Sequence, residues 1–383
     1  MSLENIGKYI EEFSRKNKNN EPYPVYSVTN SNGFCTDYFN KDVSGQDKTT
    51  YKIVPRGYFA YNPSRINVGS IDWQNIEDNV IVSPLYVVFK CSNNLDQDYL
   101  KYFLKSPEGI RLINEKAIGS VRNNLKFKEL SEFKLNIVDV KEQRNIVSKL
   151  KLIESAIENE KNQIKLYDEL IKARFVEMFG NPVANEKGWN VDLCKNLTTK
   201  IGSGATPKGG KESYLTKGIS LIRSLNVHNN QFVYDDLACI SKEQAEKLNN
   251  VIIQQGDVLL NITGASVARC CIVPNSVLPA RVNQHVSIIR CNEKLLPVFV
   301  SCMFTDDNFQ QFLLNVATGG GATREAITKE EIEKFVLITP PIERQKQFVD
   351  FVEQVDKSKV VAKQRLKLFE ELLQKKTYDY YIG

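Results

Sequence analysis

The feature that most constrains the fold is an internal repeat, in which residues near 120–180 match residues near 320–382 at a constant offset of 202 positions. The aligned pairs include Arg122 with Arg324, Phe133 with Phe335 and Gln143 with Gln345. Further upstream the offset falls to 200 and then to 199, which indicates small insertions in loops. Two copies of one structural unit therefore make up most of the chain.

Each copy ends in a segment whose apolar residues are spaced alternately four and three apart. These seam residues are Ile146, Leu150, Ile153, Ile157, Ile164, Tyr167 and Ile171 in the first copy, and Phe348, Val352, Val355, Leu366, Phe369 and Leu373 in the second. A period of 3.5 residues over four heptads predicts a long helix that buries a narrow seam against another helix. No proline or glycine interrupts either segment.

Charged residues occupy the positions that the heptad pattern skips, namely Glu160 and Arg174 in the first segment and Lys359 and Lys376 in the second. If the two helices are antiparallel, Glu160 lies roughly level with Lys376 or with a neighbouring turn, and an ion pair there could set the register. Alternatively, all four long side chains extend to solvent at the edge of the seam.

The residues before each helix contain short runs of Val, Ile, Tyr and Phe, broken by Gly, Asn and Pro, which are typical of short strands. We therefore expect an α+β fold of two similar domains, at residues 1–140 and 181–338. Two long coiled-coil helices, at residues 141–180 and 339–383, follow these domains. The Gly180-Asn181-Pro182 sequence suits the end of the first helix.

Composition excludes several classes of protein. No apolar run reaches about 18 residues and the N-terminus lacks signal-peptide features, so we expect a soluble cytoplasmic protein without membrane contact. Eight cysteines form no C-x-x-C pair and accompany only two histidines, which favours reduced, mostly buried cysteines over a zinc site or disulfide framework. The net charge of +5 alone barely favours a nucleic-acid partner.

No motif assembles a catalytic or metal site. A phosphate loop aligned on Gly210-Lys211 would have Ala205 in place of its first glycine and Glu212 in place of its hydroxyl residue. Residues 62–65 and 83–86 each miss a defining residue of the N/D/S-P-P-Y/F/W motif of amino-methyltransferases. His285 falls on a strand-like stretch and is interpreted as an ordinary structural residue, so we expect no catalytic residue in this chain.

Several stretches are similar to the specificity subunits of type I restriction–modification enzymes. Residues 62–71, N-P-S-R-I-N-V-G-S-I, resemble the Y-N-x-x-R-I-N-V-G-S-I stretch of that family. Residues 189–207, from a Trp to I-G-S-G-A-T-P, resemble its other usual opening, and residues 340–345, P-P-I-E-R-Q, resemble its P-P-x-x-E-Q helix start. In the first half the corresponding residues 139–143 keep Glu-Gln but lack the prolines. The resemblance covers essentially the whole chain.

This resemblance implies two target-recognition domains, each followed by a long spacer helix. It also implies that the two helices pack antiparallel as a coiled coil, which gives the chain approximate two-fold symmetry. It also implies that the chain binds double-stranded DNA, two methyltransferase subunits, and restriction subunits that act as motor and nuclease. The methyltransferase subunits would hold S-adenosylmethionine and methylate adenine N6. The chain itself would hold no cofactor and would be a non-catalytic specificity subunit.

The candidate DNA-binding residues are the polar and basic side chains that can reach base edges or phosphates. They are Lys48, Lys52, Arg65, Asn67, Arg122, Asn123 and Asn124 in the first domain, and Ser203, Thr206, Lys208, Arg223, Thr263, Arg269, Arg281, Thr323 and Arg324 in the second. The alternative for each is a solvated surface residue, and for Arg65 and Asn67 a structural turn. The aligned Arg122 and Arg324 suit a shared phosphate contact, so Arg324→Ala should weaken binding to all sequences and flatten its salt dependence.

At about 1.5 Å per residue, residues 146–178 form a helix about 50 Å long, longer than one DNA turn of roughly 34–36 Å. Two domains on such a helical pair could contact half-sites about one turn apart. Because the two domains differ strongly in sequence, we expect an asymmetric target. A competing hypothesis is a coiled-coil scaffold that binds only proteins, consistent with the small net charge. Another is a specificity subunit that serves a methyltransferase without a nuclease.

Overall fold

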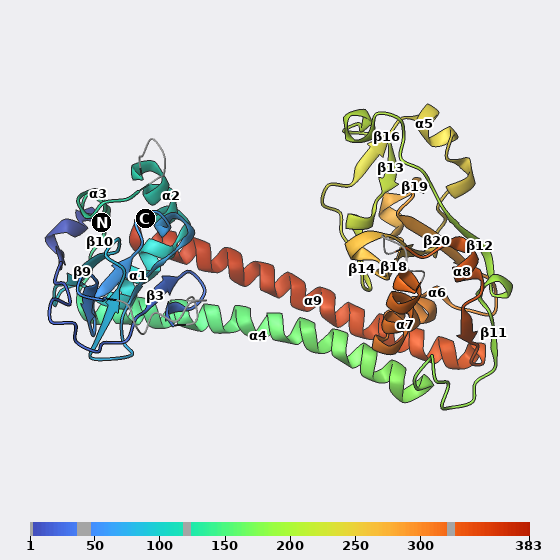
Figure 1. Cartoon of the computed structure of the whole chain (residues 1–383), viewed down its shortest axis with the longest axis horizontal. Coiled ribbons are helices and arrows are strands. Elements are labelled where there is room, and N and C mark those ends of the chain that lie inside the picture. The colour runs from blue at the N-terminus through green and yellow to red at the C-terminus, as the bar shows by residue number, and fades with distance from the viewer. Residues whose placement is uncertain (1–2, 37–46, 118–123, 320–325) are drawn as a thin grey trace. The chain divides into compact units, whose positions relative to one another are not determined.

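The computed structural model describes residues 3–36, 47–117, 124–319 and 326–383. The chain divides into two compact units, Met1–Asn162 with Ala362–Gly383, and Gln163–Val361. Each unit contains a globular head, together with one part of each long helix (Figure 1). We call these parts the first head and the second head.

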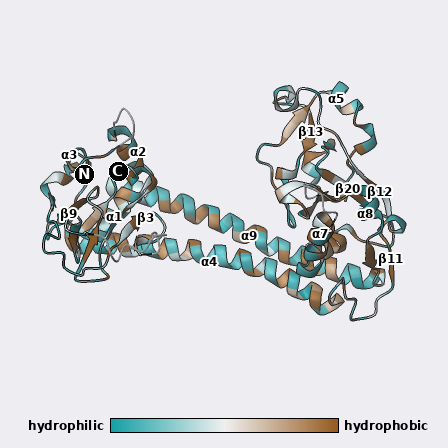
Figure 2. Ribbon diagram, viewed as in Figure 1, coloured by the Kyte–Doolittle hydropathy of each residue, from teal (hydrophilic) through white to brown (hydrophobic). Residues whose placement is uncertain are grey.

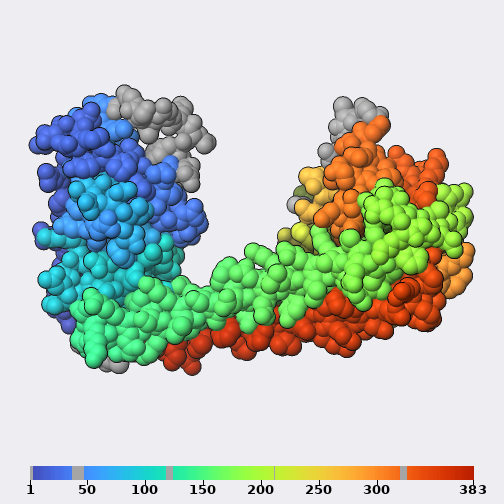
Figure 3. All heavy atoms as spheres, turned by 90° about the horizontal axis from the view of Figure 1, so that it is seen from below, coloured from blue at the N-terminus to red at the C-terminus, as the bar shows by residue number. Residues whose placement is uncertain are grey.

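The two long helices are α4 (Val140–Phe179) and α9 (Ile342–Tyr381), each of 40 residues. Within each unit they lie side by side and antiparallel (Figure 3). In the first unit Lys161 forms an ion pair with Glu370 at 3.7 Å, and in the second unit Lys359 forms one with Asp168. The predicted helices and the predicted α+β fold are therefore confirmed.

The predicted seam is the least exposed face of each helix. All thirteen seam residues are buried or half-buried, and Leu150 and Phe348 are fully buried. Apolar residues outside the seam behave differently: Leu152 is 71% exposed and Leu368 63% exposed. The hydropathy colouring agrees, because hydrophilic residues cover much of α4 and α9 while hydrophobic residues gather in the heads (Figure 2). The period of 3.5 thus identified the buried face correctly.

The predicted register of the two helices is wrong. Glu160 pairs with Arg365 at 3.1 Å, eleven positions away from Lys376, which instead pairs with Asp379 on its own helix. The alternative with all four side chains in solvent is also wrong, since the side chains of Glu160 and Lys359 are only 13% and 17% exposed. Periodicity determines which face of a helix is buried. The register of one helix along the other depends on how each helix packs against its head.

The first head is built around a four-stranded antiparallel sheet with the order β2-β9-β6-β7. These strands are β2 (Ile10–Glu12), β9 (Val87–Cys91), β6 (Phe59–Tyr61) and β7 (Ile71–Trp73). Two-stranded pairs join β1 (Leu3–Asn5) to β10 (Lys134–Asn136), β3 (Ser27–Thr29) to β4 (Gly33–Cys35), and β5 (Lys52–Pro55) to β8 (Asn79–Val82). The helices are α1 (Gln97–Lys105), α2 (Pro107–Lys116) and α3 (Phe127–Ser131).

The second head repeats this plan, with a four-stranded sheet in the order β12-β20-β17-β18. These strands are β12 (Thr198–Ser203), β20 (Val286–Cys291), β17 (Val258–Asn261) and β18 (Cys270–Ile272). A second sheet orders β16 (Ala238–Ile240), β13 (Ile219–Ile222) and β19 (Ala280–Val282), and pairs join β14 (Val227–His228) to β15 (Gln231–Phe232) and β11 (Val191–Leu193) to β21 (Val336–Ile338). The helices are α5 (Lys242–Glu246), α6 (Pro297–Phe304), α7 (Asp307–Thr318) and α8 (Lys329–Glu333).

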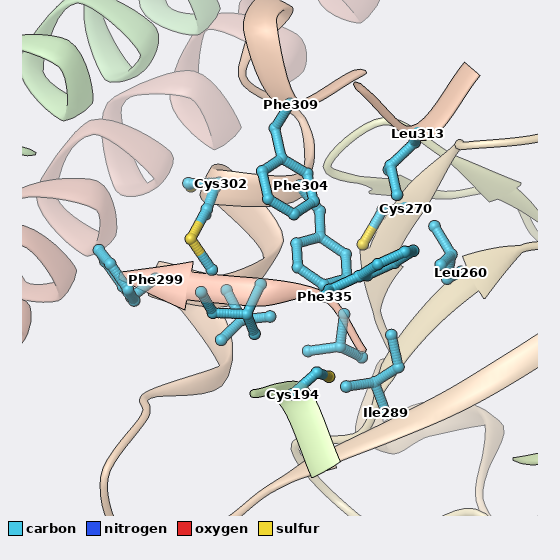
Figure 4. Packing of buried hydrophobic residues seen from close by; sticks show 14 of the residues in the cluster. Cys194, Leu260, Cys270, Ile289, Phe299, Cys302, Phe304, Phe309, Leu313 and Phe335 are labelled. Carbon is cyan, nitrogen blue, oxygen red and sulfur yellow. The ribbon is translucent and has the colours of Figure 1, made fainter. Parts of the chain in front are cut away.

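Each head has its own aromatic core, which also includes residues of the long helices. In the first unit, Tyr381 at the end of α9 packs against Tyr99 and Phe103 of α1. In the second unit, the core gathers aromatic rings and buried cysteines from α6, α7 and the central sheet (Figure 4). Apolar burial of this kind is the main favourable contribution to folding, so each head is anchored to its part of the helical pair.

A buried glutamine holds the start of each long helix. Gln143 and Gln345, which the repeat aligns, are both fully buried. In each case the amide oxygen accepts one backbone N–H and the amide nitrogen donates to two carbonyls, at distances between 2.7 and 3.0 Å. The partners are Asp96, Asn94 and Val138 for Gln143, and Leu296, Lys294 and Pro340 for Gln345. The identical contacts explain why the repeat keeps a glutamine here.

Candidate nucleic-acid interface

In both heads, polar side chains gather at one end of the central sheet. This is the end where β6 ends and β9 begins in the first head, and where β17 ends and β20 begins in the second. We call this end the loop edge of the head. In the second head the register places Asn261, the last residue of β17, opposite Val286, the first residue of β20. The backbone N–H of Ile262 donates to the carbonyl of His285 at 3.0 Å. Residues 262–269, between β17 and β18, therefore lie beside the turn at residues 283–285.

A chain of four side chains crosses this loop edge. The Thr206 hydroxyl donates to Gln284 Oε1, and Gln284 Nε2 lies 3.1 Å from His285 Nε2. On the other side of the ring, His285 Nδ1 lies 2.5 Å from Thr263 Oγ1. Thr206 and Gln284 are exposed, whereas Thr263 and His285 are half-buried. The chain thus combines side chains from three separate stretches of sequence.

The position of Thr206 depends on a glycine two residues earlier. Gly204 follows β12 directly, and its N–H donates to the carbonyl of Asn283 at 3.1 Å. A Cβ atom at Gly204 would lie 1.8 Å from the carbonyl oxygen of Val282, a distance that forces the backbone apart. Glycine is therefore required for the close approach that brings Thr206 to Gln284.

The chain after α7 returns to the same edge. Ala326 forms a β-bridge with Thr263, and the N–H of Ile327 donates to the carbonyl of Ile262 at 2.8 Å. The candidates Thr323 and Arg324 precede this contact but lie outside the described residues.

The loop edge of the first head has the same construction but different side chains. Tyr61, the last residue of β6, is opposite Val87, the first residue of β9. The turn before β9 presents Leu85, which is 76% exposed. The N–H of Leu125 donates to the carbonyl of Pro63 at 3.2 Å, so residues after α2 return to this edge as well.

The structure places several candidate DNA-binding residues at the two loop edges. In the first head these are Arg65 and Asn67, in the loop between β6 and β7, and the exposed Asn124, which precedes Leu125. In the second head they are Ser203 at the end of β12, Thr206, Thr263 and Arg269. Among the described residues, the side chain of Arg269 has no hydrogen bond or ion pair.

The other candidates form no hydrogen bond or ion pair with the loop edges among the described residues, or lie outside those residues. Lys208 is exposed and Lys48 half-buried. The guanidinium of Arg223 lies over the ring of Tyr214 at 5.2 Å and donates to the carbonyl of Asp236. Arg122 and Asn123 lie outside the described residues, as Thr323 and Arg324 do.

Two basic candidates donate hydrogen bonds to other residues of their own head. Arg281 is only 7% exposed, and its guanidinium donates to the carbonyl of Ala245 at 3.2 Å and to Asn249 Oδ1 at 3.1 Å. Burial lowers the pKa of this guanidinium. We therefore correct the expectation that Arg281 contacts DNA, because a surface position is required for that role. Lys52 is half-buried, and its ammonium group donates to the carbonyl of Tyr86 at 2.6 Å, so it holds the turn before β9. Burial lowers the pKa of Lys52 too.

Sequence reasoning missed Gln284 and gave His285 only a structural role on a strand. The strand begins one residue later, at Val286, and both side chains belong to the turn before it. A usable signal was the position of two polar residues directly before the strand-like Val286-Ser287-Ile288-Ile289 sequence. Only the fold, however, shows that Thr206 and Thr263 meet them.

The cysteines suit a packing role. Cys194, Cys270, Cys271 and Cys302 are buried, and burial raises the pKa of the Cys194, Cys271 and Cys302 thiols to about 12. Within the described ranges, no group of three or more His, Cys, Asp or Glu side chains is arranged to hold a metal ion. No helix in that part of the chain is both long and apolar enough to cross a membrane.

The fold and its loop edges define a duplicated recognition protein, with two related α+β heads on a pair of long helices. The sequence pattern of the type I restriction modification DNA specificity domain matches the chain twice, at residues 3–166 and 187–370. The chain therefore belongs to this family and is a DNA sequence-specificity subunit of a type I restriction–modification system. As such a subunit, it has DNA and the modification and restriction subunits of its system as partners.

Solved structures share the fold. A chain from a study of complex assembly and conformational transition of the type I R-M system is 15% identical, with a TM-score of 0.64 over 98% of this chain and 96% of that one. The S subunit of a type I restriction–modification system from M. genitalium is 13% identical, with a TM-score of 0.56 over 100% of this chain and 96% of that one. At this identity the likeness supports the fold alone.

Proposed function

We propose that the chain recognises an asymmetric DNA target made of two separated parts, one read by each head. The observation that carries this proposal is that the two loop edges have the same backbone construction but different side chains. At corresponding turns the first head presents Leu85 and the second presents Gln284 and His285. Since base readout depends on the donors, acceptors and apolar groups that reach the groove, such different edges select different sequences.

The chemistry on DNA belongs to the partners. In this proposal two methyltransferase subunits, carrying S-adenosylmethionine, methylate adenine N6 at the target, and restriction subunits cleave DNA. The chain supplies target selection, without a catalytic residue or cofactor of its own. It works in the cytoplasm, where DNA and these subunits meet.

The test is to map methylated adenines in cells that contain the methyltransferase partner, with and without this chain. We expect a two-part, non-palindromic motif only when the chain is present. Methylation of the same motif without the chain would contradict the proposal, as would an uninterrupted or palindromic motif. A deletion of the restriction subunit is the matched control, because it should remove cleavage and leave the methylated motif unchanged.

A further inference from the structure

We propose that the turn at residues 283–285 is the base-reading element of the second head, and that Gln284 contacts the edge of an adenine. This inference rests on the proposed function, because it assigns one base pair of the second half-site to one side chain. The turn was not among the candidate sites that the sequence indicated.

The position of Gln284 suits a reading residue. It lies between Asn283, which is 4% exposed, and His285, after which Val286 is fully buried. Gln284 itself is exposed. The backbone on both sides is therefore anchored in the sheet while one amide projects from it.

Among the residues that the structure describes, the hydrogen bonds of Gln284 leave half of its amide free. A glutamine amide has two lone pairs on oxygen and two hydrogens on nitrogen. Thr206 occupies one lone pair, and one hydrogen of Nε2 points to His285 Nε2 when His285 carries its proton on Nδ1. One acceptor and one donor remain on the same amide. These are the groups that glutamine uses for a bidentate contact with N6 and N7 of adenine.

Three neighbours act as positioning residues. Thr206 holds the amide from the β12 side, and His285 holds it from the other side while its own ring contacts Thr263 Oγ1. A side chain that is already fixed in its binding conformation loses less entropy when it binds. The chain of contacts therefore increases the preference for one base without adding a formal charge.

The first head supports the assignment. Its corresponding turn, before β9, presents the highly exposed Leu85, and Lys52 fixes the carbonyl of the next residue, Tyr86. An apolar side chain in the major groove recognises the methyl group of thymine. The same turn thus carries an amide in one head and an apolar side chain in the other.

The experiment is to select binding sites from a library of duplexes with randomised half-sites, using the full chain assembled with its methyltransferase partner. Gln284→Ala should lose the preference for adenine at one position of one half-site by roughly 5- to 150-fold. The other half-site should keep its sequence, and the salt dependence of binding should stay unchanged because glutamine carries no charge. Gln255→Ala is the matched control. Gln255 is exposed in the turn before Val258, the first residue of β17, at the end of this strand away from the loop edge.

A second variant tests the positioning residues. Thr206→Val should weaken the preference at the same base position as Gln284→Ala, and Thr206→Ser should restore it, because serine keeps the hydroxyl. A merely structural defect would instead lower binding to every sequence. Thermal melting of each variant checks that the fold is kept.

Three results would overturn the assignment: an unchanged motif with Gln284→Ala, an equal loss at all positions, or a loss in the half-site that Leu85→Ala also alters. The unaltered protein separates this failure from failure of the proposed function. If it selects a two-part motif, the proposed function stands whatever the variants do. If it selects none, the proposed function and this assignment both fail.

Discussion

At the residue scale, burial separates side chains that the sequence could not distinguish. Arg269 and Arg281 were equivalent candidates, yet Arg269 is half-exposed at the loop edge, whereas Arg281 is buried and donates to the carbonyl of Ala245 in α5. Thr206 and Thr263 were also candidates, and the structure joins them through Gln284 and His285. Residue type thus indicated which contacts a side chain can make. Only packing determined whether that side chain lies at the surface or in the interior.

Arg269→Ala should weaken binding to all DNA sequences and reduce the slope of log K against log salt by about one, because one phosphate contact is lost. Arg281→Ala should lower the melting temperature and leave that slope unchanged, because its guanidinium bonds inside the protein. Salt titrations of binding and thermal melts of both variants provide the comparison. A smaller slope for Arg281→Ala would show that the buried placement is wrong.

Gln345→Ala should destabilise the second unit. The change leaves the N–H of Leu296 and the carbonyls of Lys294 and Pro340 without their partner, and each buried unpaired group costs about 1–3 kcal/mol. The free energy of unfolding in urea measures the effect. Gln347→Ala is the control, since Gln347 lies on the exposed face of the same turn of α9. Equal losses for the two variants would refute the role of Gln345.

At the element scale, close backbone approaches decide where the loops meet. Gly202 and Gly204 looked alike in the sequence, as parts of the family-like I-G-S-G-A-T-P stretch at residues 201–207. In the structure a Cβ at Gly202 has only Lys200 Cε nearby, at 3.7 Å, whereas a Cβ at Gly204 would meet the Val282 carbonyl oxygen at 1.8 Å. The second glycine is therefore the one that positions the loop edge.

Gly204→Ala should shift Thr206 away from Gln284 and cost about 1–3 kcal/mol of stability, as overpacking usually does. Binding-site selection should then show a weaker motif in the second half-site, with the first half-site intact. Gly202→Ala should be tolerated in both measurements. If the two alanine variants behave alike, the close approach at Gly204 is not what holds the loop.

The long helices show what an element's own pattern determines. The heptad residues identified both helices and their buried faces, because a repeat of 3.5 residues can be recognised within a single segment of sequence. The pairing of Glu160 with Arg365 could not be predicted, because it depends on how α4 and α9 each pack against a head.

At the scale of the whole molecule, we predict that the length of the two long helices sets the length of the spacer between half-sites. Inserting one heptad into both helices, between Asn162 and Gln163 and between Val361 and Ala362, lengthens each helix by about 10 Å and keeps the seam in phase. We expect the preferred spacer to grow by about three base pairs, at about 3.4 Å per pair. Mapping of methylated adenines gives the spacer directly.

The control inserts the heptad into only one of the two helices. That change moves the seams out of register between the units and should abolish selective methylation instead of lengthening the spacer. An unchanged spacer after the paired insertion would mean that the helices do not set the distance between half-sites.

The duplication, the two long helices and the family follow from the amino-acid sequence, because each of them is a pattern along the chain. Tertiary structure alone decided the register of α4 against α9, the burial of Arg281 and the meeting of Thr206, Gln284, His285 and Thr263. The physical reason is that these features depend on contacts between stretches separated by tens to hundreds of residues. Such contacts leave no periodic trace in any one of the stretches they join.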